Sequence, residues 1–288
     1  MPTDRKCAFC GNIIPLSLSL CPHCGRPSLP PNVEMASSPE ERDALSRRYE
    51  EVIKDAETRG CFDVVQRFKD EVSRSKAVIA RSTLETMRLA NSDKEIYVTY
   101  YTLVDAGIRL ISGSKWDVLR SVADDALFPG FKKDIRFAAL SLDGRGLFNY
   151  GECAIVLRED MIAHRTTVFE ENSVMFMHRQ NVRMDQANSL PLGHRATWTE
   201  RDKLCVAKKG NELRENTDFS QFAELILKQG ATSEDDDFIE VHIWGPMTRL
   251  TFKRIVVNSK KITKKADRAR LRALQETVAD VGIIMEDD

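Results

Sequence analysis

The most regular alternation of apolar and polar residues lies between residues 238 and 245, in the segment FIEVHIWG. Successive side chains of a strand point to opposite faces, so Ile239, Val241 and Ile243 are predicted to share one apolar face. Glu240 then lies on the other face, with His242 beside it. A plain solvent-facing strand more often carries lysine or threonine at such positions. Glu240 is therefore the first candidate for a catalytic carboxylate.

Residues 134–176 contain the densest set of strand and turn signals. The segments DIRFAALS and ECAIVL are apolar runs of the kind found in strands covered on both faces. Between them lies the glycine-rich segment LDGRGLFNYG, which predicts a chain reversal. We expect either a cleft or an ordinary hairpin connection at the polar side chains gathered there, which are Ser141, Asp143, Arg145, Asn149 and Tyr150.

Helical periodicity appears on both sides of this region. A helix is predicted from Ser38, as N-cap, to about residue 60, with Glu41 placed to close a capping box. A second helix over residues 62–89 would complete a helical hairpin, either packed on the main domain or acting as an arm for self-association. Further helices are predicted over residues 115–128 and 219–229.

Two more strands and one long connection complete the pattern. Residues 95–104, EIYVTYYTLV, are rich in β-branched and aromatic residues, and residues 250–257, LTFKRIVV, follow a Gly-Pro turn. The polar span 178–213 has few apolar runs, which is typical of a lid or a binding loop. Together these elements predict an α+β fold, with a split, largely antiparallel sheet in its main domain.

Four cysteines near the N-terminus have the spacing of a zinc site. Cys7 and Cys10 form one Cys-x2-Cys pair, Cys21 and Cys24 form a second, and a glycine follows each pair. Four thiolates complete a tetrahedral shell around Zn²⁺, so we expect a structural site that is closed to catalysis. The segment resembles short zinc ribbons, which hold a partner or nucleic acid, or cap a chain.

Composition and charge place few constraints on function. Hydrophobic residues make up 42% and charged residues 30% of the chain, as in ordinary soluble proteins. A net charge of −1 gives no overall attraction to nucleic acid or membranes. With no apolar run near the roughly 18 residues of a membrane span, and no signal-like start, we expect a cytoplasmic protein without membrane contact. Cys61, Cys153 and Cys205 are then expected to be reduced thiols.

These signals divide the chain into predicted parts: a zinc ribbon (1–27), a proline-rich linker (28–37), a helical segment (38–92), an α+β main domain (93–258) and a basic C-terminal helix (259–288). The last part concentrates positive charge in a nearly neutral chain. Its basic residues form either a solvated helix face or a contact for nucleic acid or an acidic partner. They are Lys260, Lys261, Lys264, Lys265, Arg268, Arg270 and Arg272.

The order of segments over residues 94–258 resembles the fold of ADP-ribosyltransferases, including the toxin branch that modifies nucleic acid. The resemblance rests on a strand that ends in Ser141, the YG turn at Tyr150, and the late segment EVHIWGPMTRLTFKRIVV. It implies that Glu240 is the catalytic glutamate. The implied reaction transfers ADP-ribose from NAD to a macromolecular acceptor, which is a protein or a nucleic acid.

The resemblance also implies where NAD would be bound. Ser141 falls near the strand-end serine of the family, and Tyr150 or Trp244 would supply an aromatic platform for nicotinamide, with Tyr101 as a further candidate. Loss of nicotinamide develops positive charge on the ribose, which a nearby carboxylate stabilises. The family's second glutamate has no counterpart, because Phe238 stands at that position.

Two other classes of function stay open. One is a non-catalytic binding protein, in which the ribbon, the long helices and the basic helix hold a partner or nucleic acid. The other is a metal-dependent nuclease that uses Glu152, Glu170, Glu171 and Glu240 around magnesium. Binding of NAD separates the transferase from both alternatives, and metal-dependent cleavage of nucleic acid separates the nuclease.

Overall fold

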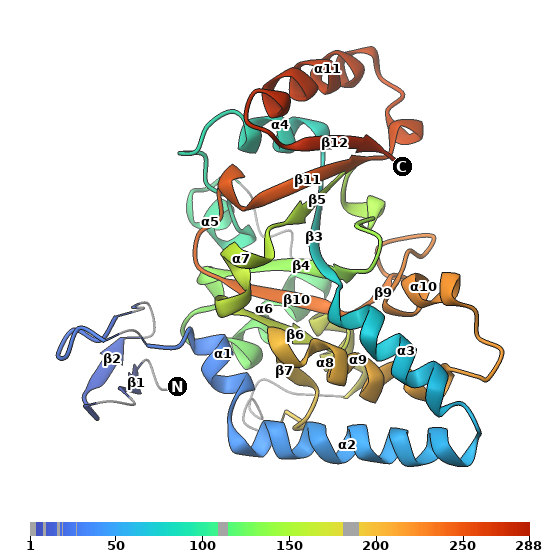
Figure 1. Ribbon diagram of the computed structural model, residues 1–288. Helices are drawn as coiled ribbons and strands as arrows, with labels where there is room; N and C mark the ends of the chain where they lie inside the picture. Colours follow the sequence, from blue (N-terminus) through green and yellow to red (C-terminus); the bar gives the residue numbers. More distant parts are fainter. Residues whose placement is uncertain are drawn as a thin grey trace.

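An eight-stranded sheet passes through the centre of the protein, in the order β12-β11-β5-β3-β4-β10-β6-β7 (Figure 1). The computed structural model describes residues 4–7, 10–15, 18, 20–26, 28–108, 115–180 and 190–288. In this sheet β11 and β12 pair in parallel, and the other neighbouring strands pair antiparallel. The strands are β3 (Lys76–Arg81), β4 (Ile135–Ser141), β5 (Cys153–Leu157), β6 (Thr166–Phe169), β7 (Arg195–Thr197), β10 (Glu240–Trp244), β11 (Phe252–Val257) and β12 (Ile284–Asp287).

Two small sheets accompany the central one. In the N-terminal segment β1 (Asp4–Lys6) pairs with β2 (Ile13–Pro15), and β8 (Leu227–Lys228) pairs with β9 (Asp237–Phe238). The predicted α+β class and the largely antiparallel pairing are confirmed. The strands that were expected to form a split sheet lie in one continuous sheet.

One face of the central sheet is covered by helices that pack through the largest cluster of buried side chains. Phe68 and Phe222 meet edge to face there, with ring centroids 5.2 Å apart, and Val241 of β10 lies in the same cluster. The apolar stripe of one helix, α2, packs on α9 within the same chain. These helices are α2 (Pro39–Thr58), α3 (Phe62–Ser73), α9 (Arg201–Lys209) and α10 (Phe222–Ile226).

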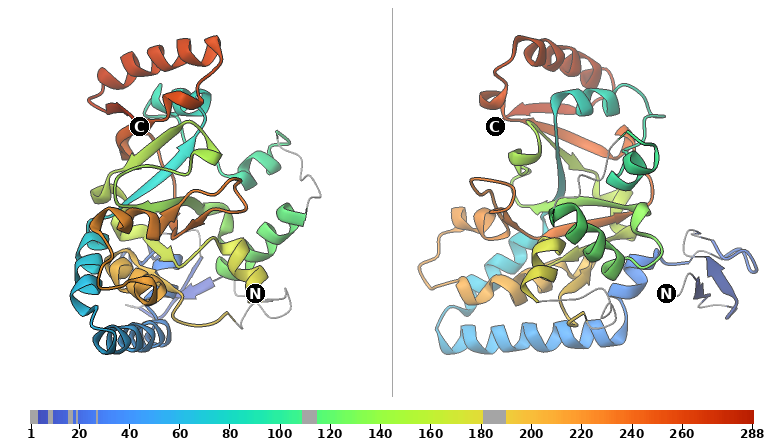
Figure 2. Two further views of the ribbon diagram at one scale, coloured as in Figure 1. Left: turned by 90° about the vertical axis from the view of Figure 1, so that its right-hand side faces the viewer. Right: turned by 180° about the vertical axis from the view of Figure 1, so that it is seen from behind.

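The opposite face is covered by a second group of helices, so that α3 and α6 lie on opposite sides of the sheet in the left view of Figure 2. A separate apolar cluster that includes Phe128, Phe169 and Phe176 joins this group to the sheet. The helices of this cluster are α6 (Lys115–Leu127) and α8 (Ser173–Arg179), and α5 (Tyr100–Asp105) is attached to α6 by the hydrogen bond from Tyr101 to Asp124. The remaining helices are α1 (Pro31–Ala36), α4 (Thr83–Ala90), α7 (Glu159–Ile162) and α11 (Lys265–Ala279). None of the helices in the described ranges is long and apolar enough to cross a membrane.

The helix predicted over residues 62–89 is interrupted by a central strand, and that prediction is wrong. The helix α3 ends at Ser73, β3 pairs with both β4 and β5, and Ser82 caps the start of α4. The run Ala77–Ala80 is buried, with Ile79 in the large apolar cluster on one face and Val78 packed against Phe148 of the β4–β5 connection on the other. Four consecutive apolar residues suit a strand covered on both faces, whereas a surface helix needs polar positions within each turn.

The strand predicted over residues 95–104 is also wrong. The segment is irregular up to Thr99, which caps the short helix α5 by accepting a hydrogen bond from the backbone N–H of Thr102. The polar span 178–213, expected to be a loop, contains β7 and α9. Trp198 and the run Leu204–Ala207 are buried there, so a few apolar residues fix a segment that looks loop-like in sequence.

The start of α2 is capped as predicted, but only in part. The Ser38 hydroxyl accepts a hydrogen bond from the backbone N–H of Glu41. The carboxylate of Glu41 does not close a capping box. It instead accepts a hydrogen bond from the backbone N–H of Gly193 at 2.6 Å and pairs with Arg195 at 2.6 Å. A long-range contact therefore replaces the local one.

Residues 31–36, which lie in the predicted linker, form α1 and dock on the sheet. The side-chain amide of Asn32 donates hydrogen bonds to the carbonyl oxygens of Arg165 and His242, at 3.2 and 3.1 Å. Asn32 is buried, so these bonds replace its contacts with water. The chain is thus anchored to β10 just after the N-terminal cysteine segment, which projects to one side in Figure 1.

Candidate functional site

Glu240 lies in a row of side chains that crosses the middle of the sheet. It is opposite Ala139 of β4, and Ala139 is opposite Val78 of β3. Directly paired residues of adjacent strands point to the same face, here the face covered by α6 and α8. The predicted alternation is confirmed, because Ile239, Val241 and Ile243 all lie in the cluster on the other face.

A cavity of about 610 Å³ opens over this row. Its volume is within the range of small-molecule sites. Strands β3, β4 and β10 form its floor, and its walls come from α4, α5, α6, α8, the hairpin at Tyr150 and the loop between β8 and β9. The polar and aromatic lining residues are Arg81, Glu85, Tyr100, Arg120, Phe137, Tyr150, Asn172, Ser233, Glu234, Phe238 and Glu240.

Glu240 is held in place from two sides. Its Oε2 accepts a hydrogen bond from the backbone N–H of Ser173 at 3.0 Å, and lies 2.9 Å from Nε2 of His242. Because a carboxylate only accepts, His242 donates through Nε2. The His242 ring is itself fixed between Phe128 and Phe137, at centroid distances of 4.8 and 5.3 Å. Within the described ranges no hydrogen bond is made to Oε1, so one carboxylate oxygen is available to a ligand.

Two guanidinium groups supply positive charge to the cavity, and the first is Arg81 at the end of β3. Its Nη1 donates to the carbonyl oxygen of Ala80 at 2.7 Å, and its guanidinium lies 4.7 Å from the centroid of the Tyr97 ring. Burial lowers the pKa of Arg81 to about 10, so the group is still charged at neutral pH. Among the described residues no carboxylate forms an ion pair with it, and the second cation, Arg120, adds to this positive field.

Tyr150 forms the outer wall through a close contact between the hairpin and β3. Gly151 has φ of 150° and packs against the backbone of Arg81 and Ser82 so closely that a Cβ atom would overlap it. Tyr150 is 40% exposed, and partial burial together with the charges of Asp236 and Glu240 raises the pKa of its hydroxyl to about 12. The hydroxyl is therefore neutral and can donate a hydrogen bond. Asn149 ties the same hairpin to the β8–β9 loop by donating to Asp236 at 3.0 Å.

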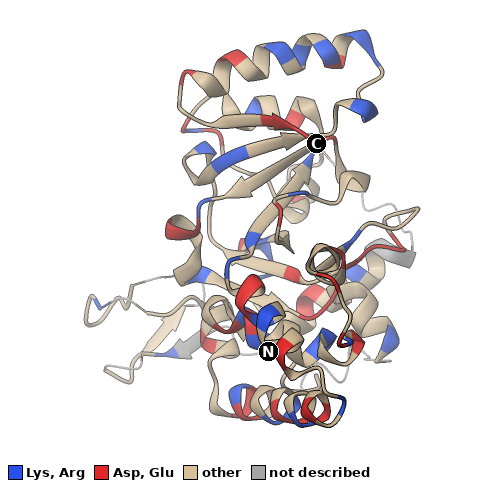
Figure 3. Ribbon diagram, turned by 45° about the vertical axis from the view of Figure 1, so that its right-hand side comes forward, with Lys and Arg blue, Asp and Glu red and all other residues tan. Residues whose placement is uncertain are grey.

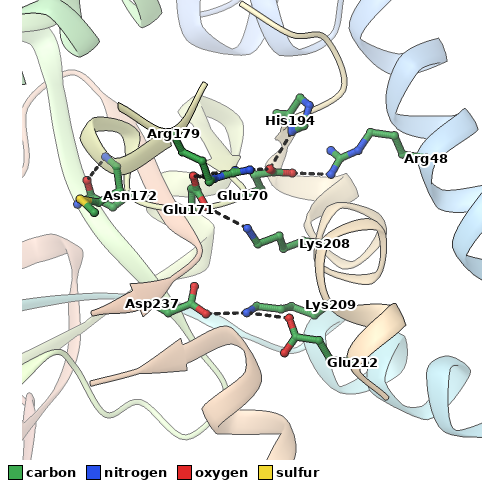
Figure 4. Close-up of polar contacts among 11 residues, drawn as sticks. Arg48, Glu170, Glu171, Asn172, Arg179, His194, Lys208, Lys209, Glu212 and Asp237 are labelled. Carbon is green, nitrogen blue, oxygen red and sulfur yellow. Dashed lines mark hydrogen bonds and ion pairs between the residues drawn. The ribbon is translucent and has the colours of Figure 1, made fainter. Parts of the chain in front are cut away.

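A network of ion pairs supports the wall that contains Asn172 (Figure 4). Glu170 pairs with Arg48 at 2.6 Å and His194 at 2.8 Å. Burial raises the pKa of Glu170, but the His194 hydrogen bond and the Arg48 charge outweigh it and bring the pKa to about 2. The next residue, Glu171, pairs with Lys208 at 3.0 Å. Both carboxylates just before α8 are therefore engaged in ion pairs within the protein.

Lys209, which follows Lys208 in α9, holds the segment that leads into β10. Lys209 of α9 pairs with Asp237 of β9 at 2.7 Å and with Glu212 at 3.2 Å (Figure 4). Lys208 and Lys209 thus hold the segments on both sides of the Glu240 end of β10. Such paired and partly buried charges fix loop positions more than they add to overall stability.

The other residues predicted to bind NAD lie away from the cavity lining. Ser141 is buried and stabilises the hairpin turn, accepting from the backbone N–H of Gly144 at 3.0 Å. The Tyr101 hydroxyl donates to Asp124 of α6 at 2.7 Å, and Trp244 packs in the apolar cluster on that side of the sheet. The structure therefore brings Glu240 and Tyr150 together and places Ser141, Tyr101 and Trp244 elsewhere.

Several polar lining residues, among them Arg81, Glu85, Arg120 and Asn172, are not candidates in the sequence analysis. Arg81 follows the apolar run AVIA, and recognition of that run as a buried strand would have placed it at a strand end. Arg120 and Asn172 reach the cavity from α6 and from the N-cap of α8. Nothing in their local sequence indicates that position, because it depends on how the helices pack on the sheet.

The four N-terminal cysteines come together as predicted. Their sulfur atoms all lie within 4.8 Å of one another, with 3.7 Å between Cys7 and Cys24 and 3.6 Å between Cys10 and Cys21. The cluster is compatible with a bound metal ion such as zinc, for which four thiolates are a preferred ligand set. In the ranges that the structure describes, it is the only group of three or more potential metal ligands.

Comparison with known proteins does not place the chain in a family. No protein-family model matches it, and no curated protein matches it. The resemblance to ADP-ribosyltransferases has no support from these comparisons.

The carboxylates proposed for a nuclease do not form a metal site in the described ranges. Glu152 accepts a hydrogen bond from the backbone N–H of Thr83 at 3.1 Å, and Glu170 and Glu171 are paired with cations. Divalent magnesium needs several oxygen ligands without competing positive charge. The geometry thus gives no support to the magnesium arrangement expected from the sequence.

Proposed function

We propose that the cavity binds NAD and that Glu240 promotes transfer of ADP-ribose to a macromolecular acceptor. The observation that supports this proposal best is the position of Glu240. It is a buried carboxylate with one oxygen fixed by Ser173 and His242, on the floor of a cavity that also contains two guanidinium groups. A fixed negative charge next to fixed positive charges suits a ligand that is anionic at one end and becomes cationic at the other.

The proposed reaction breaks the bond between the ribose C1′ and the nicotinamide nitrogen. The electron pair of that bond leaves with nicotinamide, which becomes neutral, while positive charge develops on the ribose. The carboxylate of Glu240 stabilises this charge, as carboxylates do in glycoside transfer. A nucleophilic oxygen or nitrogen of the acceptor then forms the new bond to C1′ and releases its proton to solvent.

The remaining lining residues match the other parts of NAD. Guanidinium groups bind phosphate oxygens through paired N–H donors, so Arg81 and Arg120 are assigned to the pyrophosphate. The rings of Tyr100 and Tyr150 line the same cavity and offer faces for a heteroaromatic base. His242 does not line the cavity and acts as a positioning residue, through its hydrogen bond to Glu240.

The cysteine cluster and the free thiols complete the proposal. We assign Zn²⁺ to Cys7, Cys10, Cys21 and Cys24 as a structural ion, because a full thiolate shell leaves no position for a substrate. Reduced thiols at Cys61, Cys153 and Cys205 fit a reducing cytoplasm, where NAD is also abundant.

The test compares NAD binding and NAD consumption by the wild type, Glu240→Gln and Glu224→Gln. Glutamine keeps the size and hydrogen-bonding capacity of Glu240 but removes its charge. We expect NAD affinity to change little and release of nicotinamide to fall on the order of 10²-fold or more. Glu224 is exposed on α10, outside the cavity, so its variant is the matched control and should keep full activity.

Two results would contradict the proposal. One is a wild-type protein with no measurable affinity for NAD. The other is a Glu240→Gln variant that releases nicotinamide as fast as the wild type while melting at the same temperature. Labelled NAD incubated with separate protein and nucleic-acid extracts would then identify the acceptor class, which the cavity itself does not indicate.

A further inference from the structure

The helix α11 has one buried side and one basic side. Leu274 and Val278 are buried in the large apolar cluster, and α11 packs on α4 through this side. At 100° per residue, Lys265 and Arg272 lie almost opposite Leu274 on the helix. Their side faces solvent, and both residues are exposed. Figure 3 shows the concentration of lysine and arginine along this helix, at the top of the molecule.

Four cations form what we call the basic face of α11: Lys264, Lys265, Arg268 and Arg272, all of them exposed. Positions 265, 268 and 272 are three and four residues apart, so they line up on one side of the helix. Within the described ranges no carboxylate forms an ion pair with any of the four. Arg268 donates one N–H to the carbonyl oxygen of Ile262 at 3.2 Å and keeps its other donors free.

Two acidic groups near these cations are already engaged, while Glu276, exposed one turn after Arg272, lies on the same side of the helix as Lys265 and Arg272. Asp267 pairs with Arg270 at 2.6 Å, and Asp287 accepts from the Ser259 hydroxyl at 2.9 Å. The four cations of the basic face outnumber Glu276, and they form a local positive surface on a chain whose net charge is −1. Self-repulsion among four such cations costs free energy, and a polyanion would relieve it.

We propose that the basic face of α11 binds the phosphate backbone of nucleic acid. Repeated, evenly spaced phosphates match a line of exposed cations, and binding releases the counterions condensed on the nucleic acid. Residues 259–279 contain no aromatic side chain, so bases have nothing to stack on. Binding through this surface is thus independent of base sequence and at least as strong to a duplex as to a single strand.

Other anionic partners fit the surface less well. A protein interface needs buried apolar or aromatic anchors, and only alanines separate the cations on this side of the helix. A membrane-bound amphipathic helix inserts its apolar side, but that side of α11 is already packed on α4. Nucleic acid requires neither feature.

The basic face begins next to the hairpin that carries Tyr150. Just before α11, Lys261 of the 3₁₀ turn η9 (Ser259–Lys261) donates to the carbonyl oxygen of Phe148 at 3.0 Å. Phe148 starts η2 (Phe148–Tyr150), whose last residue lines the cavity. The binding proposal does not depend on the chemistry at Glu240, but this contact would bring bound nucleic acid towards the cavity.

The test measures binding of the full chain to a labelled 20-base-pair duplex, a single strand of the same length, and vesicles containing anionic lipid. We expect duplex binding whose logarithm falls linearly with the logarithm of salt concentration. Lys264→Glu with Lys265→Glu should lower the slope by roughly one unit for each phosphate that is no longer neutralised, and affinity at least about tenfold. Arg47→Glu with Lys54→Glu is the matched control, because both residues are exposed on α2, at the far end of the molecule in Figure 1.

The proposal is overturned if neither nucleic acid binds, if only the vesicles bind, or if both double variants lose affinity equally. If the glutamate variant melts at a lower temperature, Lys264→Gln with Lys265→Gln removes the same charges with less repulsion, and the same decrease in slope is required. NAD consumption is measured in parallel. Loss of duplex binding with normal consumption, or the reverse, separates this proposal from the one made for Glu240.

Discussion

Glu240 and Arg81 reach the same cavity from strands that are far apart in the sequence. The alternation along residues 238–245 is enough to predict which face of the strand carries Glu240. Its neighbours Ile239 and Val241 are both apolar and share the opposite face. The role of Arg81 depends on β3, which pairs with strands formed by later residues. At the scale of single residues, the position of a functional side chain can therefore be predicted when it depends on one strand alone. It cannot be predicted when it depends on the packing of several elements.

Asp124 of α6 gives a prediction about pH. Burial raises its pKa from an ordinary 3.8 to about 7, and the negative charge of Glu240 adds to this effect. Tyr101 donates to one oxygen, while the other has no hydrogen-bond partner among the described residues. Between pH 3.8 and about pH 7, Asp124 holds a proton in the folded state that it has released in the unfolded state. The free energy of unfolding contributed by Asp124 therefore falls as pH rises towards 7 and levels off above it.

Asp124→Asn should remove this dependence. Compared with the variant, the wild type should lose roughly 1.4 kcal/mol per pH unit across the window, measured by chemical denaturation at a series of pH values. Asp43→Asn is the control, because Asp43 is exposed on α2. Parallel pH profiles for the wild type and Asp124→Asn would show that Asp124 is ionised throughout.

At the scale of elements, the hairpin between β4 and β5 is fixed by one glycine. Gly151 packs directly on the backbone of Arg81 and Ser82, with φ of 150°. Gly151→Ala should therefore separate the hairpin from β3 and cost about 1–3 kcal/mol of overpacking in addition to backbone strain. It should also weaken NAD binding, because Tyr150 and Arg81 would move apart.

Gly60→Ala is the matched control for this prediction. Gly60 has φ of 70° with no atom near the position of an added Cβ, so its variant should show only the cost of a left-handed backbone, roughly 1–2 kcal/mol. Urea denaturation of both variants makes the comparison. Equal destabilisation would mean that the hairpin can move away from β3 without loss.

The elements that local sequence predicted are those whose signals need no distant partner. Alternation identified β10, apolar runs bounded by glycine identified β4 and β5, and Ser38 marked the start of α2. Other elements were missed because tertiary contacts override local preference. Val65, Phe68 and Val72 continue with helical spacing to Ile79, which hides β3, and aromatic residues around Tyr100 favour a strand that the structure does not form.

At the scale of the whole molecule, the cysteine cluster is joined to the rest through α1. Metal analysis should return about one zinc per chain, and Cys10→Ser should lose it and unfold the N-terminal segment, because metal binding supplies most of the folding energy of such a site. Among the residues described there, the buried apolar cluster consists of Cys7, Ile14 and Cys21. The main melting transition should stay within a few degrees of that of the wild type, since Asn32 keeps α1 on the sheet. A single concerted transition that shifts with zinc removal would contradict this separation.

The central position of β3 also constrains how the chain can be made. On the ribosome, residues 76–81 emerge before any of the strands that will flank them, and β5 is complete only at Leu157. Until then the segment AVIA exposes apolar side chains on both faces, and its backbone is unpaired. Both features favour aggregation of nascent chains. A fragment beginning at residue 93 would have the opposite defect, with β4 and β5 facing an empty place in the middle of the sheet. The helices before β3 and the strands after it therefore belong to one cooperative unit, which becomes stable only late in translation.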